Sequence, residues 1–274
     1  MNFKIQYHKW TEKEYKKLNK SIRDLLNYES LQFYMPFYSL YFYLHNKSKA
    51  VHKIDLKRNY YLKEITEITK KRYYNSNMFM KGNIYNECKN ITTETELFCK
   101  SIPIVDPVHC VNNNYNFVNH NNYHLPSNYN YNTFHKINDI NNTAYIDVFC
   151  SYLFGNLTYQ KKSPSFPMFY GSINGMGDYN YDLTEDYMDI KNDKCFNENI
   201  DKGFQLEIYV SDSESESGSE SGSDTSKEKD NYDDCIAKIK KIPIQMLFIE
   251  KLEATLEDLI AVSYTHLRAH ETRG

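Results

Sequence analysis

The sequence predicts an α+β fold in which an antiparallel sheet packs with one long helix, preceded by a helical N-terminal extension. Two observations carry this prediction. Short runs of β-branched and aromatic residues recur between residues 82 and 250, and a single long apolar pattern of helical period begins near residue 143. With 41% hydrophobic residues, 26 tyrosines and 15 phenylalanines, the chain of 274 residues can bury a sizeable core.

Residues 1–78 form the predicted extension. Thr11 to Glu14 is a capping-box pattern followed by apolar residues at helical spacing, so we expect a helix over 12–28. A second helix is expected over 37–45 and a weaker third over 60–73. The aromatic run at 31–44 is too short to cross a bilayer and contains a proline, so we interpret it as a buried helix. No membrane partner is expected.

The remainder, residues 79–261, is the predicted sheet-bearing unit. Runs at 82–89 and 94–102 indicate a hairpin, with Phe98, Lys100 and Ile102 on one face of its second strand and Leu97, Cys99 and Ser101 on the other. Three more strands are expected at 166–173, 204–210 and 242–250.

One helix is predicted with particular clarity after residue 142. Its apolar residues recur at the 3.6-residue period, Asn142 or Thr143 can cap its start, and Asp147 lies in its first turn, where a negative charge suits the helix dipole. A last helix is expected from Thr255, which has a carboxylate three residues later.

Two segments interrupt the predicted unit. The Asn-rich stretch at 111–139 predicts a long surface loop or disorder, and the acidic, serine-rich insert at 211–234 predicts disorder. That insert holds nine acidic residues and two lysines, whereas the whole chain has a net charge of −3. The charge outside the insert is therefore modest and scattered, which argues against a nucleic-acid partner.

The six cysteines form no CxxC pair, and the first residues lack the pattern of a signal peptide. We therefore expect reduced thiols, a protein that is not secreted, and no metal site.

Residues 262–274 resemble one reading frame of a transposase sequencing adapter, so we expect the natural sequence to end near Ala261. The segment just before this junction resembles the hinge of a protein kinase. The order of the predicted elements resembles the small lobe, or N-lobe, of the divergent eukaryotic-type protein-kinase-like proteins of giant DNA viruses. The blocks that carry the resemblance are 96–107, 141–149, 163–171 and 245–260, of which the last is the most specific.

This resemblance implies an ATP site. Lys100 would reach the α- and β-phosphates from its strand, and Asp147 is the only carboxylate available on the following helix as its partner. Ile249 would be the gatekeeper, Glu250 would offer its carbonyl to the adenine amino group, and Leu252 would supply the next backbone donor and acceptor. Plainer interpretations stay open, namely that Lys100 protects a sheet edge, that Asp147 only complements the helix dipole, and that 242–250 is an ordinary buried strand.

The sequence also departs from the kinase pattern. Gly82 stands alone before the hairpin, and Gly171, Gly175 and Gly177 have the wrong place and spacing for a phosphate-binding loop. The catalytic and Mg²⁺-binding loops belong to a second lobe (the C-lobe) after the hinge, which the sequence does not contain. We therefore expect an inactive small lobe whose intact parent transfers phosphate from ATP, with Mg²⁺, to Ser or Thr of an unidentified protein substrate. The alternatives are a pseudokinase or scaffold, and a viral structural protein. The resemblance implies a location in the cytoplasm of an infected cell or in the virion.

Overall fold

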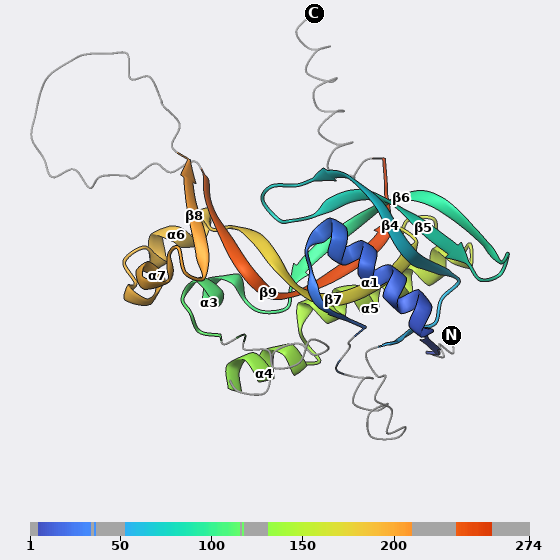
Figure 1. Ribbon diagram of the computed structural model, residues 1–274, viewed down its shortest axis with the longest axis horizontal. Coiled ribbons are helices and arrows are strands. Elements are labelled where there is room, and N and C mark those ends of the chain that lie inside the picture. Colours follow the sequence, from blue (N-terminus) through green and yellow to red (C-terminus); the bar gives the residue numbers. More distant parts are fainter. Residues whose placement is uncertain are drawn as a thin grey trace, which may run out of the picture.

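A computed structural model of the chain shows a mixed α+β fold built on a large, curved antiparallel sheet (Figure 1). The structure describes residues 5–33, 36, 53–115, 117, 131–209 and 234–253. In Figure 1, helix α1 (Glu12–Leu26) lies in front of the sheet and helix α5 (Thr143–Tyr159) lies behind it. The predicted α+β class with a large antiparallel sheet is thus confirmed, and the sheet is accompanied by several helices.

The main sheet has the strand order β2-β7-β9-β6-β5-β4, with β8 also paired to β9. A separate two-stranded sheet joins β1 (Tyr7–Lys9) and β3 (Ile54–Leu56). The bounds of the other strands are β2 Glu29–Gln32, β4 Tyr60–Lys71, β5 Met78–Asn86, β6 Ile91–Pro103, β7 Phe169–Asp182, β8 Phe204–Tyr209 and β9 Asp234–Glu250.

Strands β5 and β6 form the predicted hairpin, in continuous register from Met78 opposite Cys99 to Asn86 opposite Ile91. Burial alternates along both strands, as expected for a sheet with one face on the core. Leu97, Cys99 and Ser101 are buried, whereas Phe98, Lys100 and Ile102 face the other way and are half-buried. We call the face that carries Phe98 and Lys100 the outer face of the sheet.

Strand β9 is the longest strand in the described part of the chain, and it pairs with β6, β7 and β8. One of its edges pairs with β7 from Ile236 to Ile249, and the other edge pairs first with β8 and then with β6. The change from β8 to β6 falls between Ile239 and Ile244, where Lys241 has a φ of 50° and Pro243 has no N–H to donate. The strands predicted at 166–173 and 242–250 are therefore longer than expected.

The helix predicted over 60–73 is wrong, because β4 occupies this stretch. Register shifts after Leu62, Ile65 and Ile68 place these residues opposite Ile84, Gly82 and Met80, respectively. Each shift adds one residue and turns the period of two into a period of three, so the apolar spacing resembles that of a helix. Within residues 1–78, which were predicted to be helical, more of the described residues therefore lie in strands than in helix α1.

Two helix starts agree with their sequence signals. Thr11 and Glu14 form the reciprocal capping box of α1, and the Asn142 side chain accepts a hydrogen bond from the Ala144 N–H at the start of α5. The sequence did not predict four short helices: α3 Pro107–Val111, α4 Tyr131–Asn138, α6 Thr184–Ile190 and α7 Lys194–Asn199. Helix α4 replaces part of the expected Asn-rich loop. The helices expected over 37–45 and from residue 255, and nearly all of the acidic insert, lie outside the described residues.

The N-terminal segment packs into the core that the sheet encloses. Tyr28 and Leu31 are buried, and they lie so close to Gly177 and Gly175 of β7 that a Cβ atom at either glycine would overlap them. Helix α1 covers the edge of β4, where the Ser21 hydroxyl accepts the Ile65 N–H at 3.0 Å. Because this N–H lies at an irregularity of β4, the helix satisfies a donor that the sheet leaves free.

Arg58, between β3 and β4, ties the N-terminal segment to β7. Its guanidinium pairs with Asp55 at 2.8 Å, and its Nε donates to the Tyr170 carbonyl at 3.0 Å; both charged side chains are almost fully buried. Gly171 has a φ of 142°, and a Cβ there would lie 2.5 Å from Arg58 Nη2. The close approach of Arg58 and the positive φ both require glycine at this position.

Candidate functional site

The structure brings together the two residues that the sequence marks as catalytic candidates. Lys100 lies in the middle of β6, opposite Leu247 of β9. The prediction that Asp147 lies in the first turn of the helix is wrong, because α5 begins at Thr143 and Asp147 lies in its second turn. Lys100 Nζ and Asp147 Oδ2 are 2.5 Å apart. The side chains are 44% and 33% exposed, so solvent screens the pair and its contribution to stability is small. The pair therefore orients the ammonium on the outer face without closing it off from a ligand.

The three predicted adenine-site residues follow at the end of β9. Ile249 lies opposite Phe98, one row along the outer face from Lys100 and Leu247. Glu250 is bound to the residue before β7, because its N–H donates to the Met168 carbonyl at 2.9 Å and its carboxylate accepts the Met168 N–H at 3.0 Å. Leu252 lies beyond the strand and is 52% exposed. The sheet thus brings Ile249 near Lys100, whereas Leu252 is outside it.

Two phenylalanine rings form the surface beside Lys100. Phe79 of β5 and Phe98 of β6 are opposite each other, with ring centroids 5.1 Å apart. The Arg72 guanidinium lies 5.5 Å and 5.8 Å from these rings, and Lys251 Nζ lies 6.0 Å from the Phe79 ring. A flat ring can pack on such a surface, and the cations favour an anionic group beside it.

Sequence reasoning placed Phe98 on the face of Lys100 but assigned no role to Phe79, Arg72 or Lys251. Phe79 lies just before the expected start of the hairpin at residue 82, and Arg72 falls in the stretch that was expected to be helical. Buried and half-buried residues alternate along β5. Continuing this alternation from Gly82 toward the N-terminus would have placed Phe79 on the outer face.

The glycines do not form a phosphate-binding loop in the described part of the chain. Gly82 is buried in the middle of β5, where a Cβ would lie 2.7 Å from Leu62 Cδ1 and 2.8 Å from the Glu64 carbonyl oxygen. Gly171, Gly175 and Gly177 all lie in β7 and make room for packing side chains. Their role in the described structure is close packing, and the departure from the kinase pattern remains.

Comparisons with known proteins give no family for this chain. No family model matches it, and neither a curated protein nor a solved structure matches it significantly.

The chemistry of the site therefore follows from its own residues. Lys100 offers a cation, Asp147 holds it in place, and the phenyl rings offer an apolar surface. Cys99 adjoins Lys100 in sequence but faces the core, and burial raises the pKa of its thiol, so it is no nucleophile at neutral pH. Within the described ranges, no three His, Cys, Asp or Glu side chains gather as a metal site would require, and no helix there is long and apolar enough to cross a membrane.

Proposed function

We propose that the outer face around Lys100 is the nucleotide-binding surface of a protein-kinase-like small lobe. The observation that carries the proposal is the ion pair between Lys100 and Asp147, because it joins a mid-strand lysine to α5, the longest of the described helices that follow it. Further support comes from the pairing of β6 with β9, which sets Ile249 one row from the lysine.

In this proposal the ligand is ATP, with its phosphates at Lys100 and its base over Phe98 and Ile249. Glu250 and Leu252 would supply backbone groups to the adenine edge. In a complete parent protein, with Mg²⁺, the reaction would be phosphoryl transfer to a Ser or Thr hydroxyl. The chain of 274 residues would bind the nucleotide without performing that transfer.

Lys100→Met tests the proposal, because it keeps the length of the side chain and removes its charge. We expect ATP to bind the variant at least tenfold more weakly, since a charge-assisted contact to phosphate contributes about 1.5–3 kcal/mol. Isothermal titration calorimetry with ATP and with adenosine separates the phosphate contribution from that of the base. Adenosine affinity should hardly change.

Lys81→Met is the matched control. Lys81 is also an outer-face lysine, and it pairs with Glu67 at 2.9 Å with a similar exposure, but it lies on β5, on the other side of the Phe79–Phe98 pair from Lys100. Equal ATP binding by the wild type and Lys100→Met would remove Lys100 from the phosphate site.

A non-catalytic interaction domain is the second candidate. It is favoured by the burial of Gly82 within a strand and by the engagement of Glu250 with Met168, because both leave fewer backbone groups for a nucleotide. The absence of any ATP affinity in the wild-type chain would favour this candidate over the first.

A further inference from the structure

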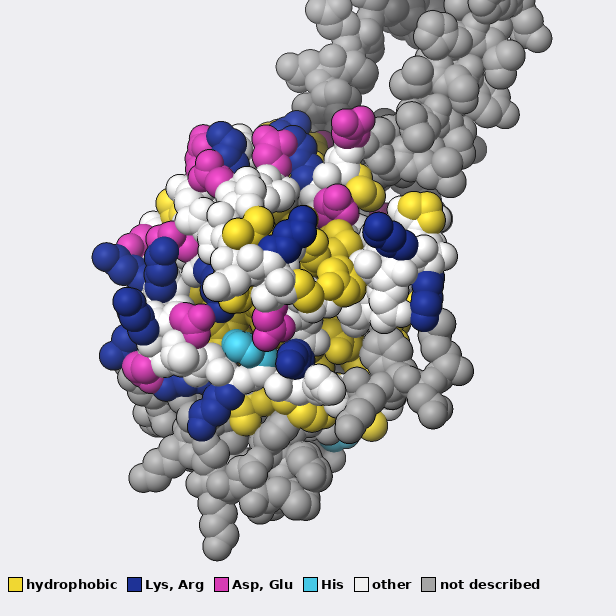
Figure 2. Space-filling model, turned by 90° about the vertical axis from the view of Figure 1, so that its right-hand side faces the viewer, with side chains coloured by type: hydrophobic (Ala, Val, Ile, Leu, Met, Phe, Trp, Pro, Cys, Tyr) yellow, Lys and Arg dark blue, Asp and Glu magenta, His cyan; other side chains and the backbone are white. Residues whose placement is uncertain are grey.

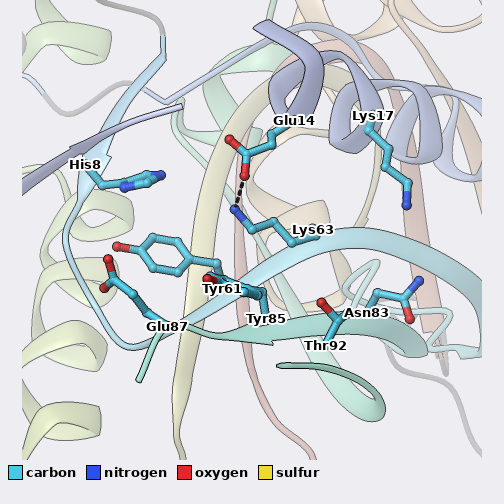
Figure 3. Close-up of a pocket in the computed structure, with 9 residues that line it drawn as sticks. All are labelled: His8, Glu14, Lys17, Tyr61, Lys63, Asn83, Tyr85, Glu87 and Thr92. Atoms are coloured by element: carbon cyan, nitrogen blue, oxygen red, sulfur yellow. Dashed lines mark hydrogen bonds and ion pairs between the residues drawn. The ribbon is translucent and has the colours of Figure 1, made fainter. Parts of the chain in front are cut away.

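A cavity of about 450 Å³ lies at the other end of the hairpin from Lys100, under α1 and β1 (Figure 3). Residues from five elements and from the turn after β5 line it: His8, Glu14, Lys17, Tyr61, Lys63, Asn83, Tyr85, Glu87 and Thr92. Thr92 and Lys100 are eight residues apart on β6, which corresponds to about 26 Å along an extended strand. The cavity is therefore separate from the proposed nucleotide surface, and its volume is in the usual range for small-molecule sites.

Aromatic rings form much of its wall. Tyr61 and Tyr85 are directly opposite each other on β4 and β5, and the His8 ring lies 4.7 Å from the Tyr61 ring. The view in Figure 2, which turns the right-hand side of Figure 1 toward the viewer, shows apolar side chains in a hollowed surface with both charge signs around it. Such a wall suits a flat or apolar ligand body.

The two lysines of the cavity have their charges compensated. Lys63 pairs with Glu14 at 2.8 Å, and its ammonium lies 4.4 Å from the Trp10 ring and 5.2 Å from the rings of both Tyr61 and Tyr85. Lys17 pairs with Glu64 at 2.7 Å. An anionic ligand would have to compete with these carboxylates.

Glu87 is the uncompensated charge. Its side chain is half-buried, and no described residue forms an ion pair or hydrogen bond with its carboxylate. Figure 3 shows it below the Tyr61 hydroxyl, with His8 on the opposite side of that hydroxyl. His8 Nε2 is also buried without a hydrogen-bond partner in the described structure. Nε2 is closed to a ligand in the cavity. Burial lowers the pKa of His8, so its ring is neutral at pH 7 and adds no positive charge beside Glu87.

We propose that this cavity binds a small organic cation, with an ammonium group at Glu87 and a flat body against Tyr61 and Tyr85. The ammonium supplies the positive charge that the carboxylate lacks. Thr92 and Asn83, farther along the cavity, can take a polar group at the other end of the ligand. Since the cavity lies between α1, β1 and the sheet, such a ligand would also hold the N-terminal segment in place.

Three probes of similar size test the charge preference. Tyramine carries an ammonium group, 4-ethylphenol lacks it, and 4-hydroxyphenylacetate carries a carboxylate instead. We expect tyramine to bind with roughly millimolar affinity, as small ligands of this size do, and the other two to bind at least tenfold more weakly. Binding is followed by chemical-shift changes of the intact chain during titration.

Glu87→Gln then tests the anchor, because it removes the charge and keeps the shape. We expect tyramine affinity to fall roughly tenfold, the range of one charge-assisted hydrogen bond. Glu94→Gln is the control, since Glu94 lies on the same face, accepts a hydrogen bond from Thr66 and does not line the cavity. Its affinity for tyramine should equal that of the wild type.

Glu87→Asp gives a second measurement that does not depend on the folding of Glu87→Gln. It keeps the negative charge and shortens the side chain, so this variant should still bind tyramine more tightly than 4-ethylphenol. Thermal melts confirm that each variant is folded. The proposal is overturned by equal affinity for tyramine and 4-ethylphenol, by a preference for 4-hydroxyphenylacetate, or by no binding of any probe to the wild type.

Discussion

Arg58 shows how much one side chain can connect. Its guanidinium bonds to Asp55 and to the carbonyls of Leu56, Tyr60 and Tyr170, and it lies 4.5 Å from the Tyr61 ring. Trp10 also donates to Asp55 at 3.2 Å. Its charge is paired and each of its three nitrogens has a partner, which offsets the cost of burying the group. This network joins the segment around β3 to the first residues of β7.

Arg58→Met should therefore destabilise the protein strongly. Removing one partner leaves the Asp55 carboxylate buried and uncompensated, which costs about 3–5 kcal/mol in the free energy of unfolding. Chemical denaturation measures the change. The exposed pair of Lys194 and Glu198 provides the control, because Lys194→Met should change the free energy of unfolding by less than about 1 kcal/mol. If Arg58→Met lowered the free energy of unfolding as little as the control does, the stabilising role assigned to Arg58 would be contradicted.

At the scale of elements, local signals predicted those elements whose pattern is undisturbed. Helix α5 and the hairpin of β5 and β6 have regular periods, and both form, although β5 and β6 begin four and three residues earlier than expected. Strand β4 was missed because its irregularities change the spacing of Leu62, Ile65 and Ile68. Those irregularities depend on pairing with β5 and on α1, neither of which is visible in the local sequence.

The start of α5 offers a test at the same scale. Asn142 is buried and caps the helix, and its side-chain NH₂ group also donates to the carbonyls of Ile104 and Lys136. Asn142→Ala should reduce the free energy of unfolding by about 1–3 kcal/mol, because it removes the cap and leaves buried carbonyls unsatisfied. Asn141→Ala, at the exposed neighbour, should have little effect in the same denaturation measurement.

For the whole molecule, the fold class could be predicted from the sequence, but not how the N-terminal segment joins the sheet. The alternation of β6 placed Lys100 on its face, and the helical pattern placed Asp147 early in α5, but their contact depends on how α5 packs on the sheet. The cavity could not be predicted from the sequence, because His8, Glu14, Tyr61 and Glu87 come from four separate parts of the chain. No short motif marks such a set of residues.

The docking of α1 on the sheet should depend on pH. Burial opposes the ionisation of Glu14, but hydrogen bonds from Lys63 and Thr11 outweigh it and lower the pKa of this carboxyl from 4.5 to about 2. Because the pKa is lower in the folded state, the stabilisation is present above pH 4.5 and is lost as the pH falls toward 2. Glu14→Gln should therefore show a smaller decrease in stability between these values. Thermal melts of the wild type and Glu14→Gln from about pH 6 to about pH 2 measure the difference. If the melting temperatures of both proteins fell in parallel, ionised Glu14 would have no role in docking α1.

The position of β9 in the sheet has a consequence for how the chain folds. Its partners β6 and β7 are made earlier, yet they are joined only through β9, which comes near the end of the described chain. During synthesis both strands therefore wait with an unpaired edge until residue 250 has left the ribosome. Pairings between such distant segments form slowly, and open strand edges favour association with other chains. The nascent protein is thus most vulnerable to aggregation just before its last strand is inserted.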